Sequence, residues 1–225
     1  MTITLYGAAL SPFVRKVRVA LAEKGLAYKL DPVSPFAPPA EFLAISPLKR
    51  IPVLRDDSEG PDATLPDSSA ICAYLERKHP APALYPAQAF AYGRALWLEE
   101  YADSDFIGTI GGGLFRAVVI NMLMKKEPDH PLAEDTWANK APRFLDYFEQ
   151  ELGNRAHFVG DMFTIADIAV ASPFVNAAHA GFAPDPARHP NLVRFLKTTH
   201  ARPSFAACIA EERKMLTNLG IPYAG

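Results

Sequence analysis

The spacing of hydrophobic and polar residues changes repeatedly along the first third of the chain and predicts a small mixed domain. Short apolar or alternating runs predict strands, and apolar residues spaced three and four apart predict helices. The resulting order, β-α-β-α-β-β-α, is typical of a compact α/β sandwich. Strands are expected at Ile3–Tyr6, Tyr28–Val33, Ile51–Arg55 and Ala63–Leu65, and helices at Pro12–Lys24, Pro38–Ile45 and Ser68–His79.

The pattern becomes purely helical after a proline-rich segment. His79–Pro86 holds three prolines, which cannot continue a helix and favour a semi-rigid linker. We therefore predict an α/β domain at residues 1–79, a linker at residues 80–88 and an all-α domain at residues 89–225. Helices of the second domain are expected at Gln88–Met124, Leu132–Leu152, Thr164–Ala180, Asn191–His200 and Ser204–Leu219.

Composition and charge narrow the class of protein. The chain has 225 residues, is 49% hydrophobic and 21% charged, and so differs from a disordered chain. Its 23 Lys and Arg nearly balance its 25 Asp and Glu, giving a net charge of −2. A near-neutral chain lacks the electrostatic footprint of a protein that binds nucleic acid or an anionic membrane. We expect neither as a partner.

Cysteine and histidine usage predicts the compartment and the absence of a metal site. Cys72 and Cys208 lie far apart, without the spacing of a disulfide framework or a zinc site, and the six histidines are scattered. The N-terminus lacks the pattern of a secretory signal, and we find no run of 18 apolar residues. We expect a cytoplasmic protein without a bound metal.

Ser11 is a candidate catalytic residue because it lies between the first strand and the first helix. Serine followed by Pro12 is a common helix start, with serine as the N-cap and proline at the first helical position. A hydroxyl at a helix N-terminus can also stabilise an anion. The two roles are compatible. Tyr6 offers a competing hydroxyl, but it lies inside the strand pattern and is expected to be partly buried.

A proline inside an apolar run marks a second candidate segment. Pro52 cannot donate to a strand ladder, so it indicates either an edge strand or a cis Ile51–Pro52 bond. A cis bond would turn the Ile51 backbone toward a cleft, where it could pair with a bound peptide. Lys49 and Arg50 are either solvated surface or ligands for a carboxylate beside that cleft.

Two further motifs stand at helix starts. Asp67 and Ser68 precede the third helix, where they either cap it or hold the ammonium and carboxylate of an α-amino acid. Thr164 and Asp167 resemble a capping box, with Phe163 as its hydrophobic staple, and predict a folding role. The run Gly111–Gly113 costs a helix about 1 kcal/mol per residue, so we expect a kink or break there.

Together these motifs resemble the cytosolic glutathione S-transferase family, in its serine-type theta-, phi-, tau-like and bacterial classes. Ser11–Arg18, Ser46–Leu54, Asp67–Ser68 and Phe163–Asp167 match family segments in the right order over nearly the whole chain. Serine stands at position 46 where asparagine is usual. Position 11 is not cysteine, which makes the cysteine-dependent classes less consistent with the sequence. The resemblance implies a thioredoxin-like domain followed by an all-α domain.

The resemblance also implies an activity and a site. Ser11 would stabilise the thiolate of glutathione, the co-substrate, for attack on a hydrophobic electrophile. The resemblance also implies a homodimer, for which Tyr74, Tyr92 and Trp97 are either candidate contacts or residues packed in the core. Peroxide or disulfide reduction, isomerisation, dehalogenation, ether cleavage and a non-catalytic binding module are the alternatives. Glutathione-binding residues would be Phe13, Lys49, Arg50, Ile51, Pro52, Asp67 and Ser68, and the electrophile site would include Ala9, Leu10, Phe106, Ile110 and Phe115.

Overall fold

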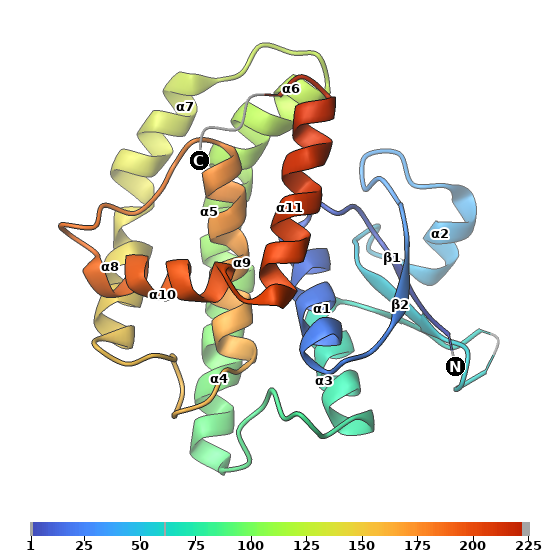
Figure 1. Cartoon of the computed structure of the whole chain (residues 1–225). Helices are drawn as coiled ribbons and strands as arrows, with labels where there is room; N and C mark the ends of the chain where they lie inside the picture. Colours follow the sequence, from blue (N-terminus) through green and yellow to red (C-terminus); the bar gives the residue numbers. More distant parts are fainter. Residues whose placement is uncertain (1, 61, 222–225) are drawn as a thin grey trace. The chain divides into compact units, whose positions relative to one another are not determined.

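The chain folds into two compact units, Met1–Tyr85 and Pro86–Gly225 (Figure 1). The structure is a computed structural model that describes residues 2–60 and 62–221. The first unit holds a small mixed sheet and the second is helical, as the sequence predicts. The first unit continues past the expected end at residue 79 and includes the first part of the expected linker.

A four-stranded sheet in the order β2-β1-β3-β4 forms the centre of the first unit. β1 pairs parallel with β2 and antiparallel with β3, and β3 pairs antiparallel with β4. α1 and α3 pack against each other on one face of the sheet, and α2 lies on the other face (Figure 1). This is the thioredoxin-like arrangement. The strands are β1 (Ile3–Tyr6), β2 (Tyr28–Asp31), β3 (Val53–Asp56) and β4 (Thr64–Pro66), and the helices are α1 (Pro12–Glu23), α2 (Ala40–Ile45) and α3 (Ser68–Lys78).

Two strands are shorter than the hydrophobic pattern predicts, and a proline accounts for one of them. β3 begins at Val53 instead of Ile51 because Pro52 has no N–H to donate to the ladder. β2 ends at Asp31 instead of Val33, although the N–H of Val33 still donates to the carbonyl of Gly7 at 3.4 Å. The hydrophobic pattern of the sequence continues through Pro52, but the ladder does not.

A buried lysine and a glutamate tie the start of the linker to the first unit. Lys24 Nζ donates to the carbonyls of His79 and Pro82, at 2.7 and 2.9 Å, and forms an ion pair with Glu76 at 2.7 Å. The Glu76 carboxylate also accepts a hydrogen bond from the N–H of Leu84. The proline-rich segment is therefore anchored by charged side chains as well as stiffened by its prolines.

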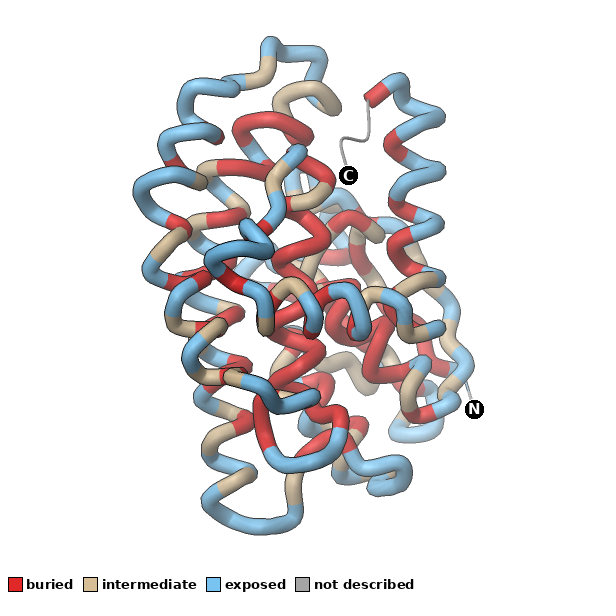
Figure 2. The backbone as a smooth tube through the Cα atoms, turned by 60° about the vertical axis from the view of Figure 1, so that its left-hand side comes forward, coloured by how far each residue is buried: buried red, intermediate tan, exposed pale blue. Residues whose placement is uncertain are grey.

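One buried helix organises the second unit. Thirteen consecutive positions of α9, Ile165–Ala177, are buried, and Figure 2 shows the buried positions continuing through the middle of the helical unit. α4 and α10 both pack against α9. A π-helical segment is written η. The helical segments of the second unit are α4 (Ala89–Tyr101), η1 (Ala102–Phe106), α5 (Ile107–Ile110), η2 (Gly111–Ile120), α6 (Asn121–Leu123), α7 (His130–Asp135), η3 (Thr136–Lys140), α8 (Pro142–Leu152), α9 (Ile165–His179), α10 (Pro190–His200) and α11 (Pro203–Asn218).

The glycine run does not break its helix, contrary to the break that the sequence suggests. Gly111 has helical dihedral angles, and the chain continues through η2 with π-type hydrogen bonding. A Cβ atom on Gly113 would lie 2.4 Å from Thr136 Oγ1 of η3. The conformational cost of glycine is accepted here because only glycine allows these two helical segments to approach so closely.

The long helical stretch Ala89–Leu123 contains an apolar window, although it holds no run of 18 consecutive apolar residues. By length and composition alone this stretch could cross a membrane, with a mean hydropathy of 1.6 over its most apolar window. The core helix of a soluble protein meets the same criterion. Here the stretch packs against α9, and many of its apolar side chains, such as Leu98 and Leu114, are buried within the helical unit.

The capping box predicted at the start of α9 is present. The N-H of Thr164 donates to Asp167 Oδ2 at 2.8 Å, and the Thr164 side chain accepts from the backbone of Asp167. The other carboxylate oxygen of Asp167 accepts from the N–H of Phe158 at 2.9 Å. One buried carboxylate thus joins the start of α9 to the loop that precedes it.

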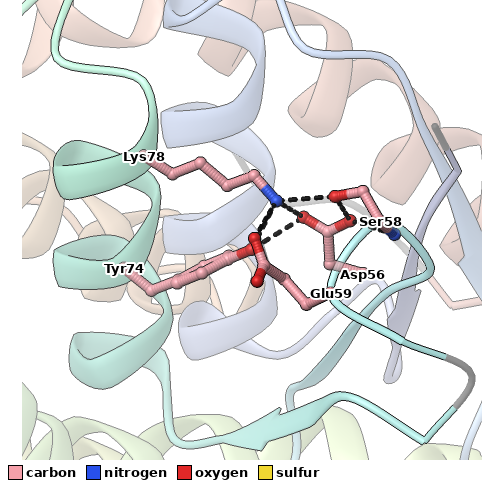
Figure 3. Close-up of polar contacts among 5 residues, drawn as sticks. All are labelled: Asp56, Ser58, Glu59, Tyr74 and Lys78. Carbon is pink, nitrogen blue, oxygen red and sulfur yellow. Dashed lines mark hydrogen bonds and ion pairs between the residues drawn. The ribbon is translucent and has the colours of Figure 1, made fainter.

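A second buried carboxylate fixes the β3–β4 hairpin to α3 (Figure 3). Asp56 accepts hydrogen bonds from Lys78 Nζ and the Tyr74 hydroxyl, each at 2.8 Å, and from Ser58 Oγ at 2.6 Å. Burial raises the pKa of the Asp56 carboxyl, but hydrogen bonds from Lys78, Ser58 and Tyr74 outweigh burial and hold it well below its usual value. Burial lowers the pKa of Lys78, but hydrogen bonds to Asp56 and Glu59 raise it above its usual value.

We predict that Asp56→Ala lowers the free energy of unfolding by about 1–3 kcal/mol at pH 7, because buried donors lose their acceptor. The lowered pKa of Asp56 gives a contribution to stability that is complete above the unfolded pKa of about 4 and is lost as the pH falls toward the folded value. In urea unfolding, the difference in free energy of unfolding between wild type and Asp56→Ala should therefore become smaller from pH 7 to pH 3. Asp57→Ala, which removes an exposed carboxylate paired with Arg55, is the control. A difference in free energy of unfolding that does not change with pH would contradict the role assigned to the Asp56 carboxylate.

We predict that Asp167→Ala lowers the free energy of unfolding by about 2–3 kcal/mol, because two N–H groups lose their acceptor in the interior. Thr164→Ala should cost about 1 kcal/mol, as for other N-caps. Urea denaturation measures both effects. Asp161→Ala, an exposed residue of the same loop, should stay within about 0.5 kcal/mol of wild type. Equal effects at positions 161 and 167 would disprove the capping role.

Candidate active site

The register of the sheet brings three separate segments to one end of the first unit. Tyr6, the last residue of β1, lies opposite Val53, and Val53 also lies opposite Pro66 of β4. Because β3 runs antiparallel to both neighbours, the residues after β1, before β3 and after β4 meet at the same edge. α1 and α3 both begin at this edge, so two helix N-termini face the same region.

Ser11 is the N-cap of α1, as predicted. Its Oγ accepts a hydrogen bond from the N–H of Val14 at 3.4 Å, and its side chain is half-buried. Just ahead of it, a Cβ atom on Gly7 would lie 2.5 Å from Val14 and 3.5 Å from Ile51. Glycine therefore allows the β1–α1 loop to lie directly against the segment that contains Ile51.

The Ile51–Pro52 peptide bond is cis, as one of the two sequence hypotheses proposes. The Ile51 side chain packs against the core cluster of Val33, Phe42 and Val53, and so does the partly buried Tyr6. None of the loop and turn backbone hydrogen bonds between described residues involves Ile51. Its side chain is anchored while its peptide groups lie beyond the ladder.

A serine closes the loop that leads to Ile51. Ser46 Oγ donates to the carbonyl of Arg50 at 2.7 Å and accepts from the N–H of Arg50 at 3.0 Å. Ser46 thus supplies both kinds of hydrogen bond at the position where the resemblance leads us to expect asparagine. Lys49 and Arg50 are exposed, and Lys49 has a φ of 57°, in the left-handed region.

Asp67 caps α3 at the same edge. Its carboxylate accepts from the N–H groups of Ser69 and Ala70, at 2.9 and 3.0 Å, and its φ is 80°. Ser68 is the first helical residue and is buried. The capping role is therefore present, and it places a negative charge at the helix N-terminus.

A lysine that the sequence analysis did not single out also reaches this helix start. Lys16 of α1 is buried, and its Nζ donates to Ser69 Oγ at 3.0 Å. Arg15 and Arg18 of the same helix are buried as well. The signal was available, because α1 carries three cations within four positions and a helix covered on several sides must bury some of them.

The expected electrophile-site residues separate into two groups. In the first unit Ala9 is half-buried, Leu10 is buried, and the glutathione-site candidate Phe13 is half-buried in the first turn of α1. In the second unit Phe115 is 8% exposed.

Phe106 and Ile110 correct the prediction, because neither has exposed surface. The Phe106 ring packs against Phe144, Phe148 and Phe174 at centroid distances of 4.9–5.4 Å. Phe106 therefore belongs to the aromatic core of the helical unit and not to a pocket wall. An apolar residue at helical spacing fits both roles, and sequence spacing alone did not distinguish them.

The fold defines a class: a thioredoxin-like domain with a cis-proline before its third strand, joined to an all-α domain. The sequence matches the family model of the glutathione S-transferase N-terminal domain over residues 5–83 and that of the C-terminal domain over residues 115–212. The chain belongs to the cytosolic glutathione S-transferase family, and so to a family of transferase enzymes.

Curated relatives agree with this assignment. The chain is 30% identical over 217 residues to glutathione S-transferase F13 of Arabidopsis thaliana, covering 91% of this chain and 94% of the relative. It is also 30% identical over 195 residues to maleylacetoacetate isomerase of Pseudomonas aeruginosa, covering 84% and 87% of the two chains. The family therefore includes relatives with different named reactions.

Solved structures give the same fold. A glutathione S-transferase from Rhodospirillum rubrum matches with a TM-score of 0.83 at 32% identity, covering 92% of this chain and 91% of that one. A glutathione S-transferase from Methylobacterium radiotolerans, in complex with glutathione sulfonate, matches with a TM-score of 0.72 at 31% identity, covering 100% and 97%.

Proposed function

We propose that the protein conjugates glutathione to a hydrophobic electrophile, with Ser11 stabilising the glutathione thiolate. The observation that carries the proposal is the sheet register, which brings the N-cap hydroxyl of α1, the Ile51–Pro52 loop and the start of α3 to one edge. A peptide bound along this edge would place its thiol at the start of α1. Detoxification of apolar electrophiles in the cytoplasm is the corresponding role.

The magnitudes support a serine acting as a hydrogen-bond donor without a general base. A free thiol has a pKa of about 8.5, so only a few per cent is thiolate at pH 7. Lowering it by about two units requires about 2.7 kcal/mol of preferential stabilisation of the anion. A hydrogen bond to a charged group contributes about 1.5–3 kcal/mol, and a helix N-terminus about 0.3–1 kcal/mol. Ser11 at the start of α1 offers both.

The remaining residues of the edge would bind the rest of the tripeptide. The peptide groups of Ile51 would pair with the cysteinyl backbone of glutathione, beside Pro52 and Phe13. Lys49 and Arg50, both exposed, would hold the glycine carboxylate. A bound γ-glutamyl group would meet Asp67 and Ser68 at the start of α3. Ala9 and Leu10, which directly precede Ser11, remain candidates for the apolar wall that faces the electrophile.

Isomerisation is the second candidate, because the isomerase of Pseudomonas aeruginosa is also 30% identical to this chain, over 195 residues. Both reactions begin with the same bound thiolate, as would reduction, dehalogenation or ether cleavage. Mass spectrometry of the products separates them. Conjugation leaves glutathione in the product, isomerisation returns it unchanged, and reduction releases it oxidised.

A non-catalytic binding module is the third candidate, since the same fold serves unrelated functions. Calorimetric titration separates it from the enzymes, because the proposed site requires glutathione to bind. Absence of heat at millimolar glutathione would favour the module and end the proposal of a transferase.

We also propose a homodimer that uses the exposed aromatic residues of α4. Phe90 is 76% exposed and Trp97 is 48% exposed, and Tyr92 lies between them on the same helix. Exposed apolar side chains at this density support an interaction surface. The hydroxyl of Tyr74, the third candidate from the sequence, donates to Asp56 inside the first unit.

We predict that Ser11→Ala raises the pKa of the thiol of bound glutathione toward about 8.5, because it removes the proposed hydrogen-bond donor to sulfur. We also expect it to lower kcat/KM by about tenfold or more. Thiolate absorbance of the complex as a function of pH measures the first effect. Ser34→Ala, an exposed serine of the same unit, is the control. An unchanged thiol pKa in Ser11→Ala would remove the role assigned to Ser11.

We predict that Phe90→Asp converts the dimer into monomers at micromolar concentration, because a carboxylate replaces an aromatic side chain in the apolar contact. Sedimentation should give twice the chain mass of 24.6 kDa for wild type and 24.6 kDa for the variant. Phe36→Asp, which changes an exposed phenylalanine of the other unit, should remain dimeric. A monomeric wild type would refute the proposal.

A further inference from the structure

A hollow of about 560 Å³ lies between three helices of the second unit, α9, α10 and α11, which are neighbours in the fold (Figure 1). Its volume falls within the range of about 300–1,000 Å³ that is usual for ligand sites. Short aliphatic side chains make up most of its lining: Val175 and Ala178 of α9, Ala201 directly after α10, and Ala206 and Ala210 of α11. The lining residues all belong to the second unit, whereas the proposed glutathione site lies in the first.

Two anchors hold α11 in place on either side of the hollow. Before it, the Phe205 ring of α11 packs against the His200 ring of α10, with the centroids 5.5 Å apart. After it, Glu212 Oε2 of α11 lies 2.8 Å from His179 Nε2 of α9, and neither side chain is exposed. The two alanines of α11 lie between these anchors, and each offers only a methyl group. The space between α9 and α11 is therefore kept open where larger side chains would fill it.

The face of α10 that leads to the hollow is basic. α10 contains no acidic residue, and Arg194, Lys197 and Ala201 are all exposed. These positions are three and then four residues apart, so they lie along one face of the helix. The Arg194 guanidinium donates to two backbone carbonyls and a side-chain amide. Among the described residues no carboxylate pairs with Arg194 or Lys197, so the charge of this basic face is not compensated within the chain.

The polar part of the lining carries no acidic group either. Among the described residues the polar side chains that line the hollow are His200 and Arg213. Both have other contacts within the chain, so we assign the attraction of an anionic partner to Arg194 and Lys197. An apolar hollow beside uncompensated cations is complementary to an apolar side chain that has carboxylates as neighbours.

We propose that the hollow and the basic face of α10 together form a docking site for an acidic peptide segment of another protein. An apolar side chain of the segment fills the hollow, and its neighbouring carboxylates pair with Arg194 and Lys197. A nucleic acid is less complementary, because its phosphates supply charge but no aliphatic side chain for the alanine-lined space. The site gives the protein an interaction that does not depend on the chemistry of glutathione.

The experiment compares three labelled peptides by fluorescence anisotropy on the full-length protein. Glu-Glu-Leu-Leu-Glu-Glu offers charge and apolar side chains, Glu-Glu-Ser-Ser-Glu-Glu keeps only the charge, and Gln-Gln-Leu-Leu-Gln-Gln keeps only the apolar side chains. The first peptide should bind about tenfold or more tightly than either of the others, because it alone satisfies both parts of the site. Saturating glutathione, which is itself an acidic peptide, should leave the affinity for the first peptide unchanged.

Two pairs of variants test the two parts of the site. Lys197→Glu should weaken binding of the first peptide about tenfold and leave the uncharged peptide within about twofold of wild type. Lys126→Glu, at an exposed cation of the same unit, is its control. Ala206→Phe fills the hollow and should also weaken binding of the first peptide about tenfold. Ala207→Phe is its control, because Ala207 is the next residue of α11, is exposed and does not line the hollow.

Several outcomes would overturn the inference. They are no binding of the first peptide, equal affinity for all three peptides, and equal effects of a variant and its control. Displacement of the peptide by glutathione would place it at the edge of the first unit instead. Tighter binding of a short single-stranded DNA would make the surface a nucleic-acid site, and loss of a dimer in Ala206→Phe, measured by sedimentation, would make the occupant a second copy of the chain.

Selective weakening by Lys197→Glu and Ala206→Phe, with both controls unchanged, supports the docking site. If Ala206→Phe does not fold, Lys197→Glu changes only an exposed side chain and decides the outcome together with the three peptides. Neither readout uses the conjugation activity, so failure of this inference leaves the proposed function untouched.

Discussion

The pairing of Val53 with both Tyr6 and Pro66 is the constraint on which the rest of the first unit depends. A single residue of β3 sets the register of two ladders, and a shift by one position would turn the side chains of β3 to the opposite faces of the sheet. It would also move the cis-proline loop away from the starts of α1 and α3. The core and the candidate site are therefore fixed by the same hydrogen bonds.

Much of this arrangement was accessible from the sequence because local chemistry and tertiary packing favour the same structure. Ser11, Asp67 and Thr164 precede helices that begin where capping predicts. The element order followed from hydrophobic period alone. The start of β3 was wrong because the apolar pattern continues through Pro52, which has no N–H to donate to the ladder.

What the sequence did not reveal depends on contacts between segments distant along the chain. Gly113 reads as a helix breaker until Thr136 is seen 2.4 Å from where its Cβ would be. Phe106 reads as a pocket residue until three phenylalanine rings are found around it. Lys16 gives no signal of a particular partner in the sequence, and only the structure shows its contact with Ser69, 53 positions away. The hydrophobic period shows on which face of a helix or strand a residue lies. It does not show which other segment of the chain packs against that face.

The buried charges of the first unit show how the fold compensates the burial of a charge. Asp56 and Lys24 hold a hairpin and a linker, and both have charged partners within the unit that compensate their burial. Lys16 donates to Ser69 Oγ, at a helix end that carries the Asp67 carboxylate. In each case the partner lies far away along the chain, so the charge is compensated only once these segments have come together in the folded state. Removing one partner would leave the other charge buried, and would therefore cost more stability than replacing both by apolar residues.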